Sequence, residues 1–267
     1  MTLMLDIKLD TAMIRDWVAE AGAIAMRYFG NVNPEWKGVA DPVTVADREI
    51  EQLLHARIRA TFPDHGILGE EYGSEMLDRE YVWTIDPIDG TRVYVEGLPS
   101  WNITIALLHQ SVPLFGLVHM PMYNDWLYTD GDDVICNGYS VVNQLAQAWA
   151  ADSYIFARSD INEWYDIRFT RIMALGSTAS HLSYTARGAS VATVTHDPYI
   201  WDIAAGAAIL SKQGGEFRFL NGELVDFSKM DLTRPIRDLI VAGHPAVTER
   251  LIPLIRPRRA PITHPAW

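Results

Sequence analysis

Hydrophobic positions in the first quarter of the chain recur at the three- and four-residue spacing of a helix that buries one face. The first such stretch covers residues 11–29 and the second covers residues 44–62. Thr44 occupies the position of an N-cap for the second helix, and Pro63 follows its last turn. The pattern therefore predicts two amphipathic helices near the N-terminus.

Shorter apolar runs follow, separated by Gly, Pro and Asn-Asp turn signals, and this pattern is typical of strands. The expected strands cover residues 66–71, 81–85, 103–108, 114–119 and 126–128. After about residue 140 the pattern alternates, with strands expected at 153–157, 167–175 and 191–195 and helices at 177–187 and 201–213. The sequence thus predicts an α+β half over residues 1–140 and an α/β half over residues 141–267, with a continuous interface between them.

Composition narrows the class of protein. A chain of 267 residues with 49% hydrophobic and 21% charged residues can bury one large core or two fused cores. The single cysteine, Cys136, excludes an intramolecular disulfide, and the apolar runs stop well short of the roughly 18 residues that a membrane span needs. Because we recognise no targeting segment, we expect a cytoplasmic protein that does not bind membranes.

The net charge of −12 argues against nucleic acid as a partner, because clustered Lys and Arg drive that binding. It also argues against an anionic substrate, unless several carboxylates are gathered around divalent cations whose charge then dominates the local field. The chemistry therefore depends on whether the sequence contains such a cluster.

The string Asp-Pro-Ile-Asp-Gly-Thr at residues 86–91 is the strongest candidate for that cluster. It follows the apolar run 81–85, so a strand end projects Asp86 and Asp89 from a turn. Mg²⁺ prefers one or two carboxylates together with waters and phosphate oxygens. If Gly90 and Thr91 open a helix, their unpaired N–H groups bind a phosphate directly.

Each acidic motif also has a purely structural interpretation. Asp-Pro and Asp-Gly are ordinary turn pairs, and Thr44 with Asp47 has the spacing of a capping box. Glu70 and Glu71 can form a solvated pair. Asp202, at the start of a helix, can simply interact with the positive helix end. Taken singly, the motifs leave both interpretations open.

Taken together, the motifs decide between these interpretations, because the chain resembles the inositol monophosphatase family of metal-dependent, lithium-sensitive phosphatases. The matching strings, in the order and spacing of that family, are Asp-Pro-Val-Thr-Val-Ala-Asp at 41–47, Gly-Glu-Glu at 69–71, Trp-Thr-Ile-Asp-Pro-Ile-Asp-Gly-Thr at 83–91, Gly-Ser-Thr-Ala at 176–179, Trp-Asp-Ile-Ala-Ala-Gly at 201–206 and Gly-Gly at 214–215. The resemblance implies the layered αβαβα sandwich of the inositol monophosphatase and fructose-1,6-bisphosphatase type, with the site between the two halves.

The resemblance also implies a metal site and a role for each acid. The implied ligands of two or three Mg²⁺ ions, with Mn²⁺ as an alternative, are Glu70, Asp86, the carbonyl of Ile88, Asp89 and Asp202. Thr91 orients the attacking water and passes its own proton to Asp47, and these two residues form the catalytic group with Glu70. Gly90 and Thr91 bind the phosphate. The implied reaction is metal-assisted hydrolysis of a phosphomonoester without a covalent intermediate.

Substrate contacts are expected from the second half of the chain. The resemblance implies Gly176 and Ser177. Inositol phosphatases of the family also carry an acid seven residues before the Asp of the Trp-Asp motif, where this chain has Thr195, and the neighbouring His196 or Asp197 can replace it if the loop shifts.

Three residues near the motifs have open roles. Arg92, after the phosphate loop, either contacts a second anionic group of the substrate or is solvated. Lys37 lies either near the metal site or in an exposed loop, and Glu71 lies either near the same site or in a solvated pair with Glu70.

The motifs do not select one substrate. A small phosphorylated polyol or sugar-like metabolite is expected, with histidinol phosphate, fructose bisphosphate and phosphoadenosine phosphate as alternatives on the same metal core. An alternative of another class is a protein that binds such a metabolite without catalysis. The resemblance also implies a homodimer.

Overall fold

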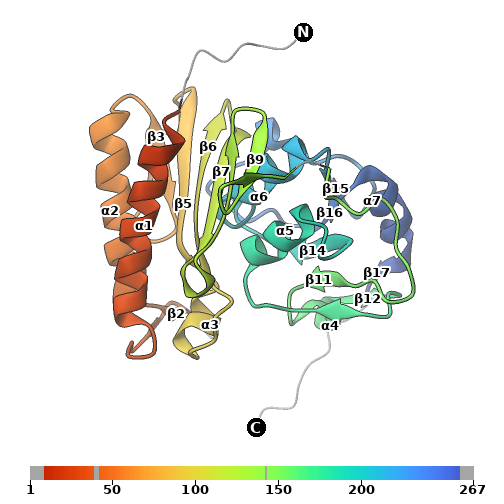
Figure 1. The fold of residues 1–267 in the computed structure, drawn as a ribbon. Helices are drawn as coiled ribbons and strands as arrows, with labels where there is room; N and C mark the ends of the chain where they lie inside the picture. Colours follow the sequence, from red (N-terminus) through yellow and green to blue (C-terminus); the bar gives the residue numbers. More distant parts are fainter. Residues whose placement is uncertain (1–8, 39–41, 142, 259–267) are drawn as a thin grey trace.

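Helices and sheets alternate in five layers across the described part of the molecule (Figure 1). The computed structural model describes residues 9–38, 42–141 and 143–258. Asp41, the first residue of the first matching string, lies outside them. The order of the layers is helices α1 and α2, a large sheet, helices α5 and α6, a second sheet, and helix α7. This is the αβαβα sandwich that the sequence predicts.

The first layer holds the two helices expected from the N-terminal pattern. Helix α1 spans Thr11–Tyr28 and helix α2 spans Val45–Thr61. Thr44 is the N-cap of α2: its hydroxyl accepts from the N–H of Ala46 and Asp47 while its own N–H donates to the Asp47 carboxylate. The capping box is therefore present, and it fixes Asp47 at the edge of the layer.

The large sheet packs against these helices. Within the described residues it has eight strands, in the spatial order β10 (Tyr139–Ser140), β9 (Asp133–Cys136), β8 (Asp125–Asp130), β7 (Val112–Met120), β6 (Asn102–His109), β5 (Tyr81–Asp89), β3 (Gly66–Gly69) and β4 (Gly73–Glu75). Strands β3 and β5 are parallel, with Gly69 opposite Ile85, and the other pairs are antiparallel. The carboxyl ends of β3 and β5 consequently meet at one edge, which places Glu70 beside Asp86.

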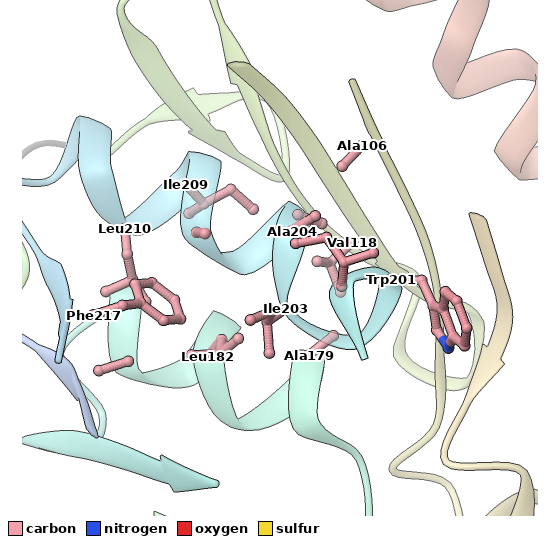
Figure 2. Packing of buried hydrophobic residues seen from close by; sticks show 14 of the residues in the cluster. Ala106, Val118, Ala179, Leu182, Trp201, Ile203, Ala204, Ile209, Leu210 and Phe217 are labelled. Carbon is pink, nitrogen blue, oxygen red and sulfur yellow. The ribbon is translucent and has the colours of Figure 1, made fainter. Parts of the chain in front are cut away.

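The middle layer joins the two sheets. Helices α5 (Thr178–Ala186) and α6 (Ile200–Lys212) pack together, and apolar side chains from both sheets cover them (Figure 2). Ala106 and Val118 reach this core from the large sheet and Phe217 reaches it from the second. The central core thus draws on residues before and after position 140.

The second sheet is smaller and mixed. Its order within the described residues is β13 (Ile172–Met173), β11 (Ile155–Ala157), β14 (Ala192–His196), β16 (Leu239–Gly243) and β15 (Glu216–Phe219). Helix α7 (Pro245–Leu251) covers its outer face, and the short helix α4 (Ile161–Trp164) follows β11. Two small sheets pair β1 (Glu35–Trp36) with β2 (Pro42–Val43) and β12 (Tyr165–Ile167) with β17 (Ile255–Pro257).

One predicted element is wrong. The strand expected over residues 167–175 is present only as Ile172–Met173, which pairs with β11 at the sheet edge. Residue 167 ends β12, which pairs with β17, so the two ends of the segment belong to different sheets. The intervening Arg-Phe-Thr-Arg crosses between them, and the Arg168 N–H donates to the carbonyl of Leu254. Among the described residues, every helix is too short or too polar to cross a bilayer.

Candidate active site

The turn after β5 places the chemistry at the edge of the large sheet. The register of β5 against β6 shifts between Asp86 and Asp89, so the strand bulges before it ends. Gly90 follows with φ 94° and ψ 40°, a left-handed conformation that glycine adopts without strain. Helix α3 (Thr91–Val95) begins at the next residue. The helix expected after Gly90 is therefore present, although it is only five residues long.

Glu70, Asp86, Asp89 and Asp202 lie close enough to perturb one another. Burial raises the pKa of Asp86 well above its usual range, and the next largest contribution comes from the Glu70 carboxylate. Asp89 and Asp202 raise the pKa of Asp86 further. Burial, followed by the charge of Asp89, raises the pKa of Asp202 to about 7. Asp86 and Asp89 belong to β5, Glu70 directly follows β3, and Asp202 belongs to helix α6, so tertiary packing creates the cluster.

The protein holds two of these carboxylates through its own donors. Asp89 accepts from the Ser177 hydroxyl at 2.7 Å and from the Ala179 N–H at 2.5 Å, and both donors lie at the start of α5. Asp202 accepts from the Tyr199 N–H at 2.8 Å. By contrast, Oδ1 of Asp86 is buried and has no hydrogen-bond partner among the described residues. A buried, unpartnered carboxylate oxygen beside other carboxylates is costly unless a cation satisfies it.

The donor set fits a hard divalent cation. All four side chains are carboxylates, and the Ile88 carbonyl lies in β5 between Asp86 and Asp89. The donors are therefore oxygens of the kind that Mg²⁺ prefers. In the part of the chain that the structure describes, however, no three Asp, Glu, His or Cys side chains enclose a position for a metal ion. The physical reason is visible in Asp89 and Asp202, whose oxygens face protein donors. The carboxylates are gathered but do not form a closed cage.

Lys37 brings a positive charge to the edge of this cluster. Its ammonium lies 2.6 Å from Oε1 of Glu71 and 3.4 Å from Oε1 of Glu70. Burial raises the pKa of Glu70 well above its usual range; the charge of Lys37 opposes the rise, and Asp202 and Glu71 add smaller contributions to it. Of the two interpretations of Lys37, the structure therefore favours the one near the acidic cluster.

Thr91 and Asp47 come together from segments 44 residues apart in the chain. The Thr91 hydroxyl lies 3.4 Å from Oδ1 of Asp47 and 3.0 Å from the Ile88 carbonyl, so two acceptors compete for one proton. Oδ2 of Asp47 accepts from Thr44 in the capping box. Burial raises the pKa of Asp47 to about 6, although the hydrogen bonds from Thr44 oppose the rise. Asp47 thus caps helix α2 with Oδ2 and faces Thr91 with Oδ1.

A cleft of about 890 Å³ opens beside these residues. Its wall on the side of the large sheet contains Asp89, Gly90, Thr91 and Arg92. Its other wall belongs to the second half of the chain, which contributes residues 158–160, 174–178, His181 and Asp202. The predicted contacts Gly176, Ser177 and Arg92 therefore line the cleft, but the Ser177 hydroxyl is already bonded to Asp89.

The other predicted substrate residues lie elsewhere. Thr195, His196 and Asp197 are described by the structure but do not line the cleft. Strand β14 continues to His196, so Thr195 is 2% exposed between β11 and β16, and its hydroxyl has no partner among the described residues. The expectation of a substrate loop that begins at residue 195 is corrected: the loop begins two residues later, at Asp197, which has a left-handed φ of 48°.

Sequence reasoning missed Arg158, Ser159 and Asp160, which line the cleft after strand β11. The signal was present, because three polar residues follow directly after the apolar run Ile-Phe-Ala. The position of these three residues in the cleft follows from a strand pairing that the sequence does not identify. Strand β11 pairs in parallel with β14, and β14 leads to helix α6 and Asp202. Parallel neighbours deliver their carboxyl ends to the same edge.

Comparison with known proteins shows the family and the fold of the chain. A profile described as the inositol monophosphatase family matches residues 8–259. A fructose-1,6-bisphosphatase/inositol-1-monophosphatase of Thermotoga maritima is 36% identical over 219 residues, which cover 79% of this chain and 85% of the relative. The solved structure of a Thermotoga maritima IMPase superimposes with a TM-score of 0.79 at 28% identity, over 92% of this chain and 95% of that one.

A further solved structure is similar in fold. An IMPase/NADP phosphatase in complex with Mg²⁺ and phosphate superimposes with a TM-score of 0.81, over 96% of this chain and 98% of that one. At 19% identity this likeness concerns the fold alone.

Proposed function

The chain belongs to the inositol monophosphatase family, whose members are metal-dependent phosphomonoesterases, and from this premise we propose that it hydrolyses a small phosphorylated polyol or sugar-like metabolite with Mg²⁺. One observation carries the proposal: Oδ1 of Asp86 is buried without a hydrogen-bond partner in the part of the chain that the structure describes, beside the carboxylates of Glu70, Asp89 and Asp202. Bound cations would remove the repulsion within such a cluster and make it compatible with an anionic substrate.

In the proposed reaction the side chains have distinct tasks. Glu70, Asp86, Asp89, Asp202 and the Ile88 carbonyl would hold the Mg²⁺ ions. When bound, Mg²⁺ supplies a water of lowered pKa and stabilises the charge on the phosphoryl and leaving oxygens. The N–H groups of Gly90 and Thr91, at the turn after β5, would bind the phosphate oxygens. The leaving group would extend into the cleft.

Thr91 and Asp47 would orient the attacking water. The Thr91 hydroxyl can accept a hydrogen bond from that water once its own proton points to Asp47, 3.4 Å away, or to the Ile88 carbonyl, 3.0 Å away. Asp47 is held in place by Thr44, and so it can receive the proton without moving. No side chain need become a covalent nucleophile.

Phosphate release from a panel of substrates tests the proposal. The panel contains inositol 1-phosphate, histidinol phosphate, fructose 1,6-bisphosphate, phosphoadenosine phosphate and 4-nitrophenyl phosphate, each with Mg²⁺, with Mg²⁺ plus Li⁺, and with EDTA. We expect Mg²⁺-dependent release from at least one monoester, inhibited by Li⁺. If histidinol phosphate is the one compound that is hydrolysed, the proposed polyol substrate is replaced by histidinol phosphate.

Substitution at the metal site separates catalysis from binding alone. Asp89→Asn should remove most Mg²⁺-dependent turnover, because Asp89 is a proposed ligand. Asp132→Asn is the matched control, since Asp132 is an exposed acid paired with Lys212. Absence of release from every compound by the unmodified protein would contradict the proposal and favour a protein that binds a phosphorylated metabolite without catalysis.

A further inference from the structure

The wall of the cleft formed by residues 158–160 carries an anchored carboxylate. Arg158, Ser159 and Asp160 follow strand β11 and line the cleft that also contains Thr91 and Asp202. This wall lies close to the acidic cluster, because Arg158 and Asp202 line the same cleft and the charge of Arg158 opposes the rise in the pKa of Asp202 that burial causes. A substrate whose phosphate is bound at Gly90 and Thr91 would therefore place its other end against this wall.

Asp160 is fixed by two neighbours. Nε of Arg158 donates to Oδ1 of Asp160 at 3.1 Å, and one terminal nitrogen of Arg158 donates to Oδ2 at 3.0 Å. Nε2 of His196 lies 3.2 Å from Oδ1 as well. The His196 side chain is only 9% exposed, between the rings of Trp164 and Tyr165. A bidentate arginine and a packed histidine leave the carboxylate little freedom to rotate.

Asp160 nevertheless keeps capacity for a ligand. An ionised carboxylate has about four acceptor positions, and the contacts with Arg158 and His196 use three of them. Its side chain is 31% exposed. Burial raises the pKa of Asp160, but the hydrogen bonds from His196 and Arg158 outweigh it and lower the pKa overall, so the group is ionised at neutral pH.

The charges of the wall favour a neutral group over a second anion. Among the described residues that line the cleft, the arginines are Arg92 and Arg158, and each is already paired with a carboxylate. Arg92 donates to Glu96 at 2.5 Å. A second phosphate would have to break one of these pairs, and a cation at the remaining acceptor position of Asp160 would lie beside the positive charge of Arg158. A hydroxyl both donates and accepts, and it can join the pairs without adding charge.

We propose that Asp160 is the specificity-determining residue of this cleft and that its carboxylate accepts a hydrogen bond from a hydroxyl of a neutral polyol. Arg158 and His196 are its positioning residues. The inference rests on the proposed function, because it assumes that the phosphate lies at Gly90 and Thr91. The inference assigns the contact with the substrate hydroxyl to Asp160, which follows β11, and not to residues 195–197 at the end of the neighbouring strand β14.

A pair of matched variants tests the inference. Asp160→Asn removes the charge from the wall, while Asp197→Asn makes the same change at an acid 3.6 Å from the other nitrogen of His196 but outside the cleft. Each is measured with inositol 1-phosphate and with 4-nitrophenyl phosphate, which has no free hydroxyl. We expect Asp160→Asn to raise KM for inositol 1-phosphate by about tenfold or more, with kcat nearly unchanged and 4-nitrophenyl phosphate affected less than about twofold. Asp197→Asn should change neither.

Positioning is tested separately from folding. His196→Gln should raise KM for inositol 1-phosphate by a smaller factor than Asp160→Asn and leave 4-nitrophenyl phosphate unchanged, because it loosens the carboxylate without removing it. A merely structural role would lower kcat for both substrates together. Equal losses on both substrates in Asp160→Asn, or no change in KM, would overturn the inference.

Calorimetric titration with inositol 1-phosphate keeps this result distinct from a failure of the proposed function. If the unmodified protein hydrolyses nothing but binds inositol 1-phosphate, and Asp160→Asn weakens that binding, the hydrolase proposal fails and the role of Asp160 stands. If the protein hydrolyses 4-nitrophenyl phosphate but neither binds nor hydrolyses inositol 1-phosphate, the hydrolase proposal stands and the role of Asp160 is overturned.

Discussion

Asp47 shows how one residue satisfies two interpretations that the sequence presents as alternatives. The Thr-x-x-Asp spacing indicates a capping box, and the family resemblance implies a proton acceptor for Thr91. The structure contains the capping box on Oδ2 and brings Thr91 to within 3.4 Å of Oδ1. Because a carboxylate has two oxygens, the structural and chemical roles are compatible. The proton relay itself stays a prediction.

Substitution of Thr91 tests that relay. Thr91→Ala removes the hydroxyl that would orient the water, and we expect kcat to fall by about 10²-fold or more, as is usual when a proton-transfer group is lost. Thr91→Ser keeps the hydroxyl and should retain activity within about tenfold. Steady-state kinetics with Mg²⁺, together with Tm values to confirm folding, provide the measurement. Equal activity in the two variants would argue against the relay.

Glu51 is a buried acid that sequence reasoning did not identify. It is 1% exposed and accepts from the N–H groups of Glu71 and Tyr72, both at 2.8 Å, so it holds the turn that follows Glu70. Burial raises its pKa to about 7, against smaller opposing contributions from these two hydrogen bonds; Glu71 adds to the rise, and Lys37 opposes it.

This pKa predicts a dependence of stability on pH. The ordinary pKa of the group is 4.5, so between about pH 4.5 and 7 the folded state binds a proton that the unfolded state has lost. Stability therefore falls as the pH rises through this window. Glu51→Gln should flatten the slope of unfolding free energy against pH, measured in urea from pH 5 to 8. An unchanged slope would show that Glu51 does not titrate there.

At the scale of elements, sequence patterns predict helices better than strands. They predict the position of a strand better than the strands with which it pairs. Both N-terminal helices agree with the structure to within one residue at each end, because periodicity and caps are local signals. The strand expected at 167–175 is wrong because its ends join different sheets, which is a tertiary fact. For the same reason the sequence did not predict that Arg158 and Asp160 line the cleft, because their position depends on the pairing of β11 with β14.

The contact between β7 and α6 is another feature that patterns do not show. A Cβ at Gly116 would lie 2.3 Å from the carbonyl oxygen of Ala205, so the strand and the helix approach through a position without a side chain. A Cβ at Gly206, on the same helix, would lie 2.5 Å from Cδ1 of Leu182. The first obstacle is the backbone of α6. The second is the Leu182 side chain, whose Cδ1 can move by a change of rotamer but whose Cβ, 2.7 Å away, cannot.

These two glycines give a matched prediction. Gly116→Ala should destabilise the protein by about 3 kcal/mol or more, because the helix must move away from the sheet. Gly206→Ala should cost less, about 2 kcal/mol, because Cδ1 of Leu182 can move by a change of rotamer and alanine favours the helix, although Cβ of Leu182 moves only with the α5 backbone. Urea unfolding of both variants measures the difference. A larger cost at Gly206 would show that the α5 and α6 contact, rather than the sheet contact, is the rigid one.

At the scale of the whole molecule, the acidic cluster joins segments that are far apart in sequence. Asp86 and Asp89 come from β5 of the large sheet, Glu70 follows its strand β3, and Asp202 comes from α6, which packs between the two sheets. The division into halves at residue 140 stays a prediction, since the central core includes side chains from both sides of it. Cations held by the cluster would link the large sheet to α6, and the net charge of −12 adds to their attraction.

Thermal unfolding with and without Mg²⁺ tests this link without reference to activity. A ligand that binds only the folded state adds about 2.7 kcal/mol of stability at 100 times its Kd, which for a chain of this size raises Tm by roughly 5 to 10 °C. We expect such a rise for the unmodified protein and a much smaller one for Asp86→Asn. Asp132→Asn, at an exposed acid, should respond to Mg²⁺ as the unmodified protein does.

The same variant carries a second expectation of opposite sign. Without Mg²⁺, Asp86→Asn should be at least as stable as the unmodified protein, because it removes a buried carboxyl group whose ionised form Glu70, Asp89 and Asp202 repel. An ordinary buried residue would lose stability on substitution under either condition. A variant that is stabilised without Mg²⁺ and insensitive to it would therefore identify Asp86 as a ligand, whereas a loss of stability in both conditions would assign it a structural role.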